Sequence, residues 1–139
     1  MKTLFTFAIC LLLFSLSTMA GRPPEAVARA FKLKFPTASH VKWGKENPSE
    51  WEANFVMAGI NSSANFSTDG SWLETEKEVP LNQLPEAVVI AIKKAGKNNQ
   101  IIGASMIESL KDGILYEADV KSRIRKKEVI YRVDGSLLK

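Results

Sequence analysis

The chain has 139 residues, of which 45% are hydrophobic and 24% are charged, and its formal net charge is +4. These values are ordinary for a globular protein, so they exclude a disordered tail, a collagen-like fibre and a multi-span membrane protein. Because Cys10 is the only cysteine, a disulfide scaffold and a cysteine-based zinc site are excluded as well.

Residues 1–20 have the pattern of a secretory signal peptide. Lys2 precedes an apolar run, Leu4–Leu16, and the segment ends in small residues before Gly21. The run is too short to cross a bilayer comfortably. Acylation of Cys10, the lipoprotein alternative, is disfavoured because the cysteine lies inside the apolar run. We therefore expect a periplasmic or secreted chain with no membrane span after cleavage.

The rest of the sequence repeats itself. Three blocks occur twice in the same order: Pro24–Val27 and Pro85–Val88, Trp51–Phe55 and Tyr116–Val120, and Phe66–Leu73 and Tyr131–Leu138. Ordered internal matches of this kind are the signature of a duplicated unit. We expect two copies, residues 21–80 and 81–139, within one compact domain.

Each copy begins with a helix signal. Proline suits the first turn of a helix, and the following glutamate suits the positive end of the helix dipole. Apolar residues then recur at helical spacing until Pro36 stops the first run and Gly96 the second. The spacing predicts two short amphipathic helices, which need a partner surface to be stable.

Antiparallel strands are predicted after each helix. The expected ranges are 39–45, 51–57 and 61–68 in the first copy, and 101–110, 116–121 and 126–133 in the second. Alternation places Trp51, Phe55, Phe66, Tyr116 and Tyr131 on an inner face. Asp69-Gly70 and Asp134-Gly135 predict tight turns. The fold class is therefore α+β: two tandem helix-plus-meander units with the helices on one face of the sheet and the other face open to solvent.

Residues that could carry catalysis are few. His40 has no second ligand or nucleophile at a recognisable spacing, so it is expected in a strand facing water. Asp69 and Asp134 are explained by their turns. Glu74, Glu76 and Glu78 share one strand face, which is expected to be exposed because like charges repel, with weak cation binding as a minor alternative. We expect no enzyme, no cofactor and no metal.

A candidate binding face follows from strand parity. Trp72 alternates with Glu74, which would leave its ring on the open side, although a twisted hairpin end could also bury it. The candidate partner-binding residues are Trp72, Glu52, Asn54, Glu74, Glu117, Asp119, Lys121 and Arg132. A separate basic run, Arg123 to Lys127, is typical of a solvated hairpin tip.

The arrangement resembles a known family. The pattern is carried by Pro24–Phe35, Trp43, Trp51–Ala53, Asp69–Glu74, Leu84–Val88 and Asp134–Gly135. It resembles the PepSY-like, β-lactamase-inhibitor-like (BLIP-like) secreted proteins of the Bacteroides group, over nearly the whole exported chain. The resemblance implies a helix-plus-sheet unit that binds or inhibits a secreted hydrolase. The inhibitor that gives the family its name has disulfides, whereas residues 21–139 contain no cysteine.

The sequence therefore predicts a non-catalytic exported binding module. Its expected partner is an unidentified secreted or periplasmic protein or peptide, docked on the open sheet face, and not a nucleic acid. Two alternatives remain open: an envelope accessory protein that binds a small molecule or glycan through Trp72, and a structural envelope-stress protein without a specific ligand.

Overall fold

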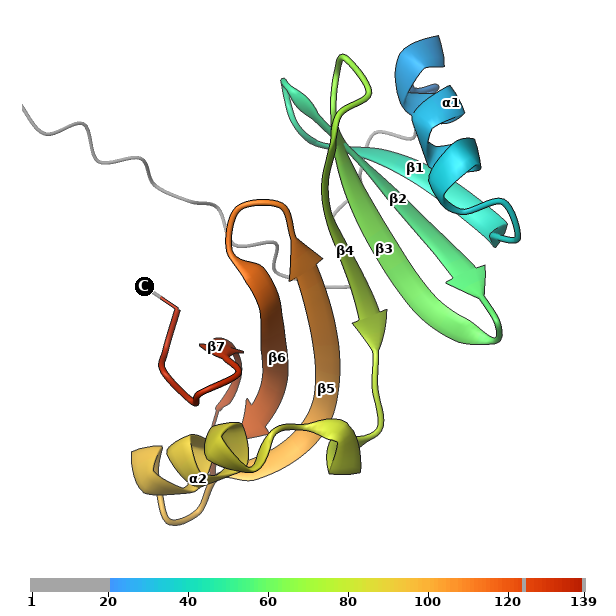
Figure 1. The fold of residues 1–139 in the computed structure, drawn as a ribbon. Coiled ribbons are helices and arrows are strands. Elements are labelled where there is room, and N and C mark those ends of the chain that lie inside the picture. The colour runs from blue at the N-terminus through green and yellow to red at the C-terminus, as the bar shows by residue number, and fades with distance from the viewer. Residues whose placement is uncertain (1–20, 124, 139) are drawn as a thin grey trace, which may run out of the picture.

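The computed structural model describes residues 21–123 and 125–138. The predicted signal peptide and Cys10 lie outside this range. These residues form two α-helices, one short 3₁₀ helix and seven strands (Figure 1). Their order is α1 (Glu25–Lys34), β1 (Ser39–Asn47), β2 (Glu50–Met57), β3 (Ile60–Ser67), β4 (Trp72–Glu78), the 3₁₀ helix (Leu81–Gln83), α2 (Glu86–Ala95), β5 (Gln100–Ser109), β6 (Gly113–Lys121) and β7 (Lys126–Arg132). The predicted α+β class is confirmed.

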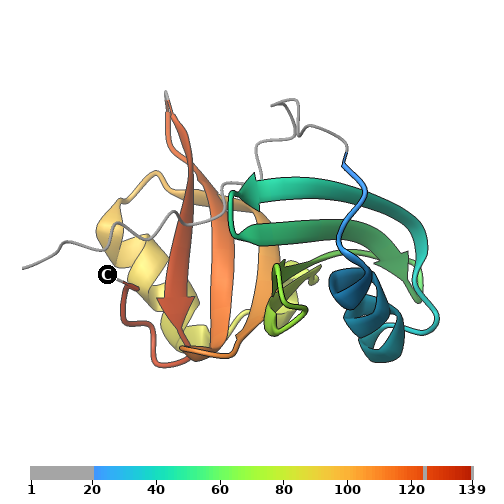
Figure 2. The same ribbon diagram turned by 90° about the horizontal axis from the view of Figure 1, so that it is seen from above.

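All seven strands belong to one antiparallel sheet. Their order in the sheet is their order in the chain, so every strand pairs with its sequence neighbour. The sheet is strongly twisted, and β1–β3 run at a steep angle to β5–β7 (Figure 2). No helix of the described chain is long and apolar enough to span a membrane.

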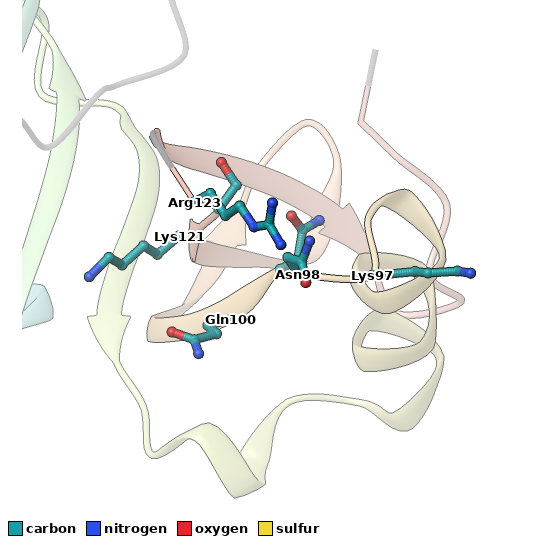
Figure 3. A pocket seen from close by; sticks show the side chains of 7 residues that line it. Lys97, Asn98, Gln100, Lys121 and Arg123 are labelled. Carbon is teal, nitrogen blue, oxygen red and sulfur yellow. The ribbon is translucent and has the colours of Figure 1, made fainter.

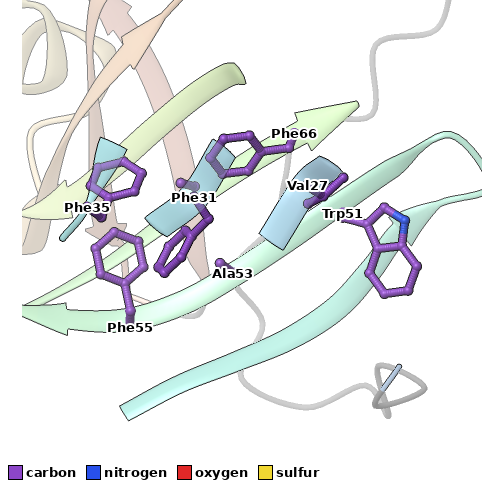
Figure 4. Close-up of a cluster of buried hydrophobic side chains, with 8 residues drawn as sticks. Val27, Phe31, Phe35, Trp51, Ala53, Phe55 and Phe66 are labelled. Carbon is purple, nitrogen blue, oxygen red and sulfur yellow. The ribbon is translucent and has the colours of Figure 1, made fainter. Parts of the chain in front are cut away.

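Helix α1 covers the first half of the sheet. Glu25 occupies its first turn and Lys34 its last, in keeping with the helix dipole. Val27 and Phe31 lie four residues apart, so they share one face and are buried against the strands. The ring of Phe31 meets that of Phe55 edge to face, with 5.1 Å between centroids (Figure 4).

Helix α2 covers the second half in a similar way. Val88 and Ile92 are its buried residues and pack with Ala118 and Tyr131 of the sheet. Gly96 ends the helix in an extended conformation. The Asn99 side-chain amide donates a hydrogen bond of 3.1 Å to the carbonyl of Ile92, which satisfies one of the last carbonyl groups of the helix.

Both predicted Asp-Gly turns are present. Asp69 Oδ1 accepts a hydrogen bond of 2.9 Å from the backbone N–H of Ser71, and Asp134 Oδ1 accepts one of 2.9 Å from Ser136. The following glycines adopt the left-handed conformation, with φ of 91° at Gly70 and 82° at Gly135. The two aspartates are therefore turn residues, as expected.

Candidate binding face

The face of the sheet opposite the helices carries most of the predicted binding residues. The core residues of the strands occupy the alternate positions that face α1 and α2. They extend from Trp51 to Phe66 in the first half of the sheet and from Ala104 to Tyr131 in the second. The strand register therefore places the remaining positions on the other side. We call this side the open face, since the core residues that pack with α1 and α2 occupy the opposite side of the described sheet.

Cross-strand pairing brings the predicted residues of the open face together in rows. Glu52 pairs with Asn65, which in turn pairs with Glu74. Farther along the sheet, Asp119 pairs with Glu128. By the same register, the open face includes seven of the eight predicted residues: Glu52, Asn54, Glu74, Glu117, Asp119, Lys121 and Arg132.

Trp72 is the exception: of the two placements that the sequence left open, the structure shows the buried one, not the place on the open face. Asn65 pairs with Glu74, but the next residue, Phe66, pairs with Trp72, so a bulge at Leu73 reverses the parity of the strand end. The Trp72 ring packs against the core under α1. Its Nε1 donates a hydrogen bond of 2.9 Å to Thr75 Oγ1, and Lys34 Nζ lies 4.0 Å from the ring centroid.

The open face is less exposed than its polarity suggests. Glu52, Glu76 and Glu117 are only 6%, 7% and 5% exposed. Ile107 and Leu115, which share the Glu76 row of the same face, are also buried. The expectation of an exposed glutamate face on β4 is therefore wrong at Glu76. The twist of the sheet explains this difference, because it packs the side chains of neighbouring strands against one another on this side.

Burial changes the acid–base behaviour of these carboxyl groups. Desolvation raises the pKa of Glu76 to about 7 and that of Glu117 to about 8. Desolvation also raises the pKa of Glu74 and of Glu128. Neighbouring carboxylates add to the effect: the pKa of Glu117 is raised further by Glu76, Glu128 and Asp119.

These carboxyl groups form an acidic belt across the open face, which we define as Glu52, Glu74, Glu76, Glu117, Asp119 and Glu128. Basic residues border it. Arg132 Nη2 lies 3.3 Å from Asp112 Oδ1, and Lys121 pairs with Lys126 where β6 and β7 meet their connecting turn. Because the whole chain carries a net positive charge, the belt is a local concentration of acidic residues.

Sequence reasoning missed two members of the belt. Glu76 was assigned to an exposed strand face, and Glu128 was not considered. The alternation of β7 contains the signal for Glu128, since Val129 and Tyr131 face the core and their neighbours must face the other way. The burial of Glu76 depends on sheet curvature, for which the sequence has no comparable signal.

The other candidates do not form a site. His40 is an exposed residue of β1, as predicted, and its Nδ1 lies 3.2 Å from the hydroxyl of the adjacent Ser39. The basic run is a hairpin tip, closed by a hydrogen bond of 2.8 Å from the N–H of Ser122 to the carbonyl of Arg125. A depression of about 360 Å³ lies beside this tip, but its Lys97 and Lys121 side chains point apart (Figure 3). These two lysine side chains therefore do not form a site that could surround an anion.

A comparison with family models finds a match over residues 49–139, more than half of the chain, to the family described as "Putative beta-lactamase-inhibitor-like, PepSY-like". The chain belongs to this family. The match includes β2–β4 and the whole second half of the sheet. No curated protein matches the chain.

Solved structures from Bacteroides share the fold. A "putative periplasmic" protein of Bacteroides eggerthii is 21% identical, with a TM-score of 0.75 over 86% of this chain and 88% of that one. A DUF2874 family protein of Bacteroides ovatus is 28% identical, with a TM-score of 0.71 over 86% of each chain. A BLIP-like protein of Bacteroides fragilis is 24% identical, with a TM-score of 0.69 over 88% of this chain and 87% of that one.

Proposed function

We propose that this PepSY-like chain is an exported, non-catalytic binding module, and that its open face docks a secreted or periplasmic protein with basic side chains. The acidic belt is the observation that carries the proposal. Acids concentrated on one face of a positively charged chain provide charge complementarity for a basic surface, which gives specificity and a faster encounter. The periplasmic description of its structural neighbour from Bacteroides eggerthii supports the location.

The proposed module consists of two tandem units, and matched contacts support this duplication. Ser67 N–H donates to the carbonyl of Ser71, and Arg132 N–H donates to that of Ser136, 65 residues later. In each unit the turn glycine lies against the first helical alanine: Gly70 against Ala26 and Gly135 against Ala87. Two copies of one unit would place two similar half-sheets side by side, which widens the open face.

Inhibitor-like docking fits the geometry of the belt better than catalysis does. The carboxyl groups are fixed on the strands of a continuous sheet, so they are held in place before a partner arrives. A basic side chain placed over Glu76 or Glu117 would satisfy a group that is costly to leave charged and buried. The family description, which names β-lactamase-inhibitor-like proteins, supports a hydrolase as the class of partner.

The glycan alternative loses its main support in the fold. Stacking on a sugar requires an accessible aromatic ring, and Trp72 is instead packed beneath α1 with Lys34 over its ring. The structural envelope-stress alternative makes a different prediction, because it expects no specific partner at the open face.

Affinity capture from envelope extract tests the proposal. Immobilised residues 21–139 would be compared with a belt variant, Glu74→Gln with Asp119→Asn, at salt concentrations from about 0.05 M to about 0.3 M. We expect the unmodified chain to retain a defined protein whose capture weakens as salt increases. The belt variant should lose that protein.

A second double variant controls for charge. Glu25→Gln with Glu108→Gln removes the same charge from exposed positions on the helix side, so it should retain the partner. Equal capture by both variants would contradict docking at the belt. A hydrolytic activity that survives purification and disappears on substitution of His40 or Asp134 would contradict a non-catalytic role.

A further inference from the structure

Three carboxylates of the open face converge at β6 and β7. Asp119 pairs directly with Glu128 across the two strands, and Glu117 lies two residues before Asp119, on the same face. One carboxylate oxygen from each residue lies within 4.8 Å of the other two. Like charges placed directly opposite destabilise a sheet, so this arrangement calls for a compensating positive group.

Two of these carboxylates have buried oxygens without partners. The Oε2 atoms of Glu117 and Glu128 are buried, and neither has a hydrogen-bond partner in the described chain. Glu117 as a whole is only 5% exposed. A buried acceptor left without a partner costs free energy, and more when it is charged. The cost would be recovered if a cation were held between the carboxylates.

The neighbouring strand makes room for the third carboxylate. Gly103 of β5 pairs with Asp119, next to a register shift at Ile101. A Cβ at Gly103 would collide with the Asp119 carboxylate and lie 3.2 Å from its Cγ. The absence of a side chain at Gly103 therefore lets the Asp119 carboxylate lie across the sheet.

We propose that Glu117, Asp119 and Glu128 bind a divalent cation, with Ca²⁺ as the best match. All three donors are carboxylate oxygens, which hard cations prefer. Ca²⁺ binds oxygen at about 2.3–2.6 Å, so two of its ligand oxygens can lie up to about 5 Å apart. The observed spacing falls within that limit. This proposed site needs no protein partner, and it differs from the expectation, from the sequence, of no metal.

The surrounding charges set the expected strength of binding. Lys121 and Lys126 lie on the same face, next to the three carboxylates. Within the described part of the chain, neither lysine forms an ion pair with them. Their positive charge will still weaken cation binding. We therefore expect a dissociation constant of about 0.1–1 mM, the range of extracellular calcium modules.

Calorimetric titration of residues 21–139 with CaCl₂ tests the proposal, at about pH 8.5 and after removal of metals with chelator. Saturable binding of one Ca²⁺ per chain is expected, together with a higher Tm. MgCl₂ should bind at least roughly tenfold more weakly, because Mg²⁺ gives up its waters reluctantly. NaCl at matched ionic strength should not reproduce the increase in Tm.

Two variants that each remove one carboxylate test where the ion binds. Glu117→Gln and Glu128→Gln should each weaken Ca²⁺ binding by at least roughly tenfold, while Glu108→Gln, an exposed acid on the helix side, should not change it. Because Gln matches Glu in shape, circular dichroism and Tm in chelator will confirm that each variant folds. No saturable binding up to about 10 mM Ca²⁺, or equal binding by all three variants, would overturn the proposal.

Discussion

Gly70 lies directly against the backbone of Ala26, where the first hairpin turn meets the start of α1. A Cβ at Gly70 would be 2.8 Å from the Ala26 carbonyl oxygen, and Gly70 has φ of +91°. Gly135 repeats the contact in the second half, where a Cβ would be 2.5 Å from the Ala87 oxygen. Both turns therefore hold their helix against the sheet at a distance that only glycine permits.

Replacing either turn glycine by alanine should destabilise the domain strongly. Gly70→Ala and Gly135→Ala each combine an unfavourable left-handed backbone with a backbone collision, so we expect a loss of at least about 2 kcal/mol in the free energy of unfolding. Urea denaturation would measure the loss. Gly59→Ala and Gly113→Ala are matched controls: their φ values are +78° and +74°, but a Cβ at either would meet nothing within 4 Å.

The two control variants distinguish the cost of the left-handed backbone from the cost of the collision between the turn and the helix. Gly59→Ala and Gly113→Ala should cost only about 1 kcal/mol, the price of the left-handed conformation alone. If all four variants lost the same free energy, the close approach of turn and helix would not contribute to stability.

Two residues of α1 should respond very differently to truncation. Phe31 is 6% exposed and contacts four aromatic rings, while Leu33 is 77% exposed. Phe31→Ala should lower the free energy of unfolding by about 3–5 kcal/mol because it leaves a cavity in the core. Leu33→Ala should change it by less than about 0.5 kcal/mol. Thermal denaturation of both variants would measure the contrast, and comparable losses would contradict the observed packing of α1.

The sequence predicted the α+β class because large apolar residues alternate along the strands of the inner face. Trp51, Phe55 and Phe66 determined which positions face α1, and the Asp-Gly pairs marked the turns. Alternation did not predict the side of the sheet on which Trp72 lies, because the extra residue of a β-bulge has no recognisable pattern in the sequence.

The candidate binding face was harder to predict than the core. Alternation placed Glu117 and Asp119 on the open face, but it did not predict the burial of Glu117, which arises from sheet curvature. The pairing of Asp119 with Glu128 depends on the register of β6 and β7 across the Ser122–Arg125 turn. A one-residue slip would have separated the two carboxylates, so only the structure brings them together.

Trp72 should contribute to stability and not to ligand binding. Trp72→Ala removes a ring from the core edge, together with its hydrogen bond to Thr75 and its contact with Lys34, so we expect a loss of about 2–4 kcal/mol. Lys34→Met should cost about 0.5–1 kcal/mol, the cation–π part alone. Urea denaturation measures both. Cell-wall fragments should leave tryptophan fluorescence unchanged, and quenching that depends on Trp72 would restore the glycan alternative.

The stability of the domain should fall as pH increases from about 5 to about 8, in the absence of divalent cations. Folding raises the pKa of Glu76 from 4.5 to about 7 and that of Glu117 from 4.5 to about 8. Between the unfolded and folded pKa values, the folded state binds more protons than the unfolded chain. Stability therefore decreases with increasing pH throughout this window and levels off above about pH 8.

Neutral variants should flatten that pH dependence. Glu117→Gln and Glu76→Gln each remove one titrating group, so the double variant should lose little stability between about pH 5 and about pH 8. At about pH 8 its free energy of unfolding should be higher than that of the unmodified chain. Urea denaturation in chelator at several pH values measures the slope. Glu108→Gln, at an exposed position, should keep the original slope. A stability that increases over the same interval would show that these two carboxyl groups are more readily ionised in the folded protein than in the unfolded chain.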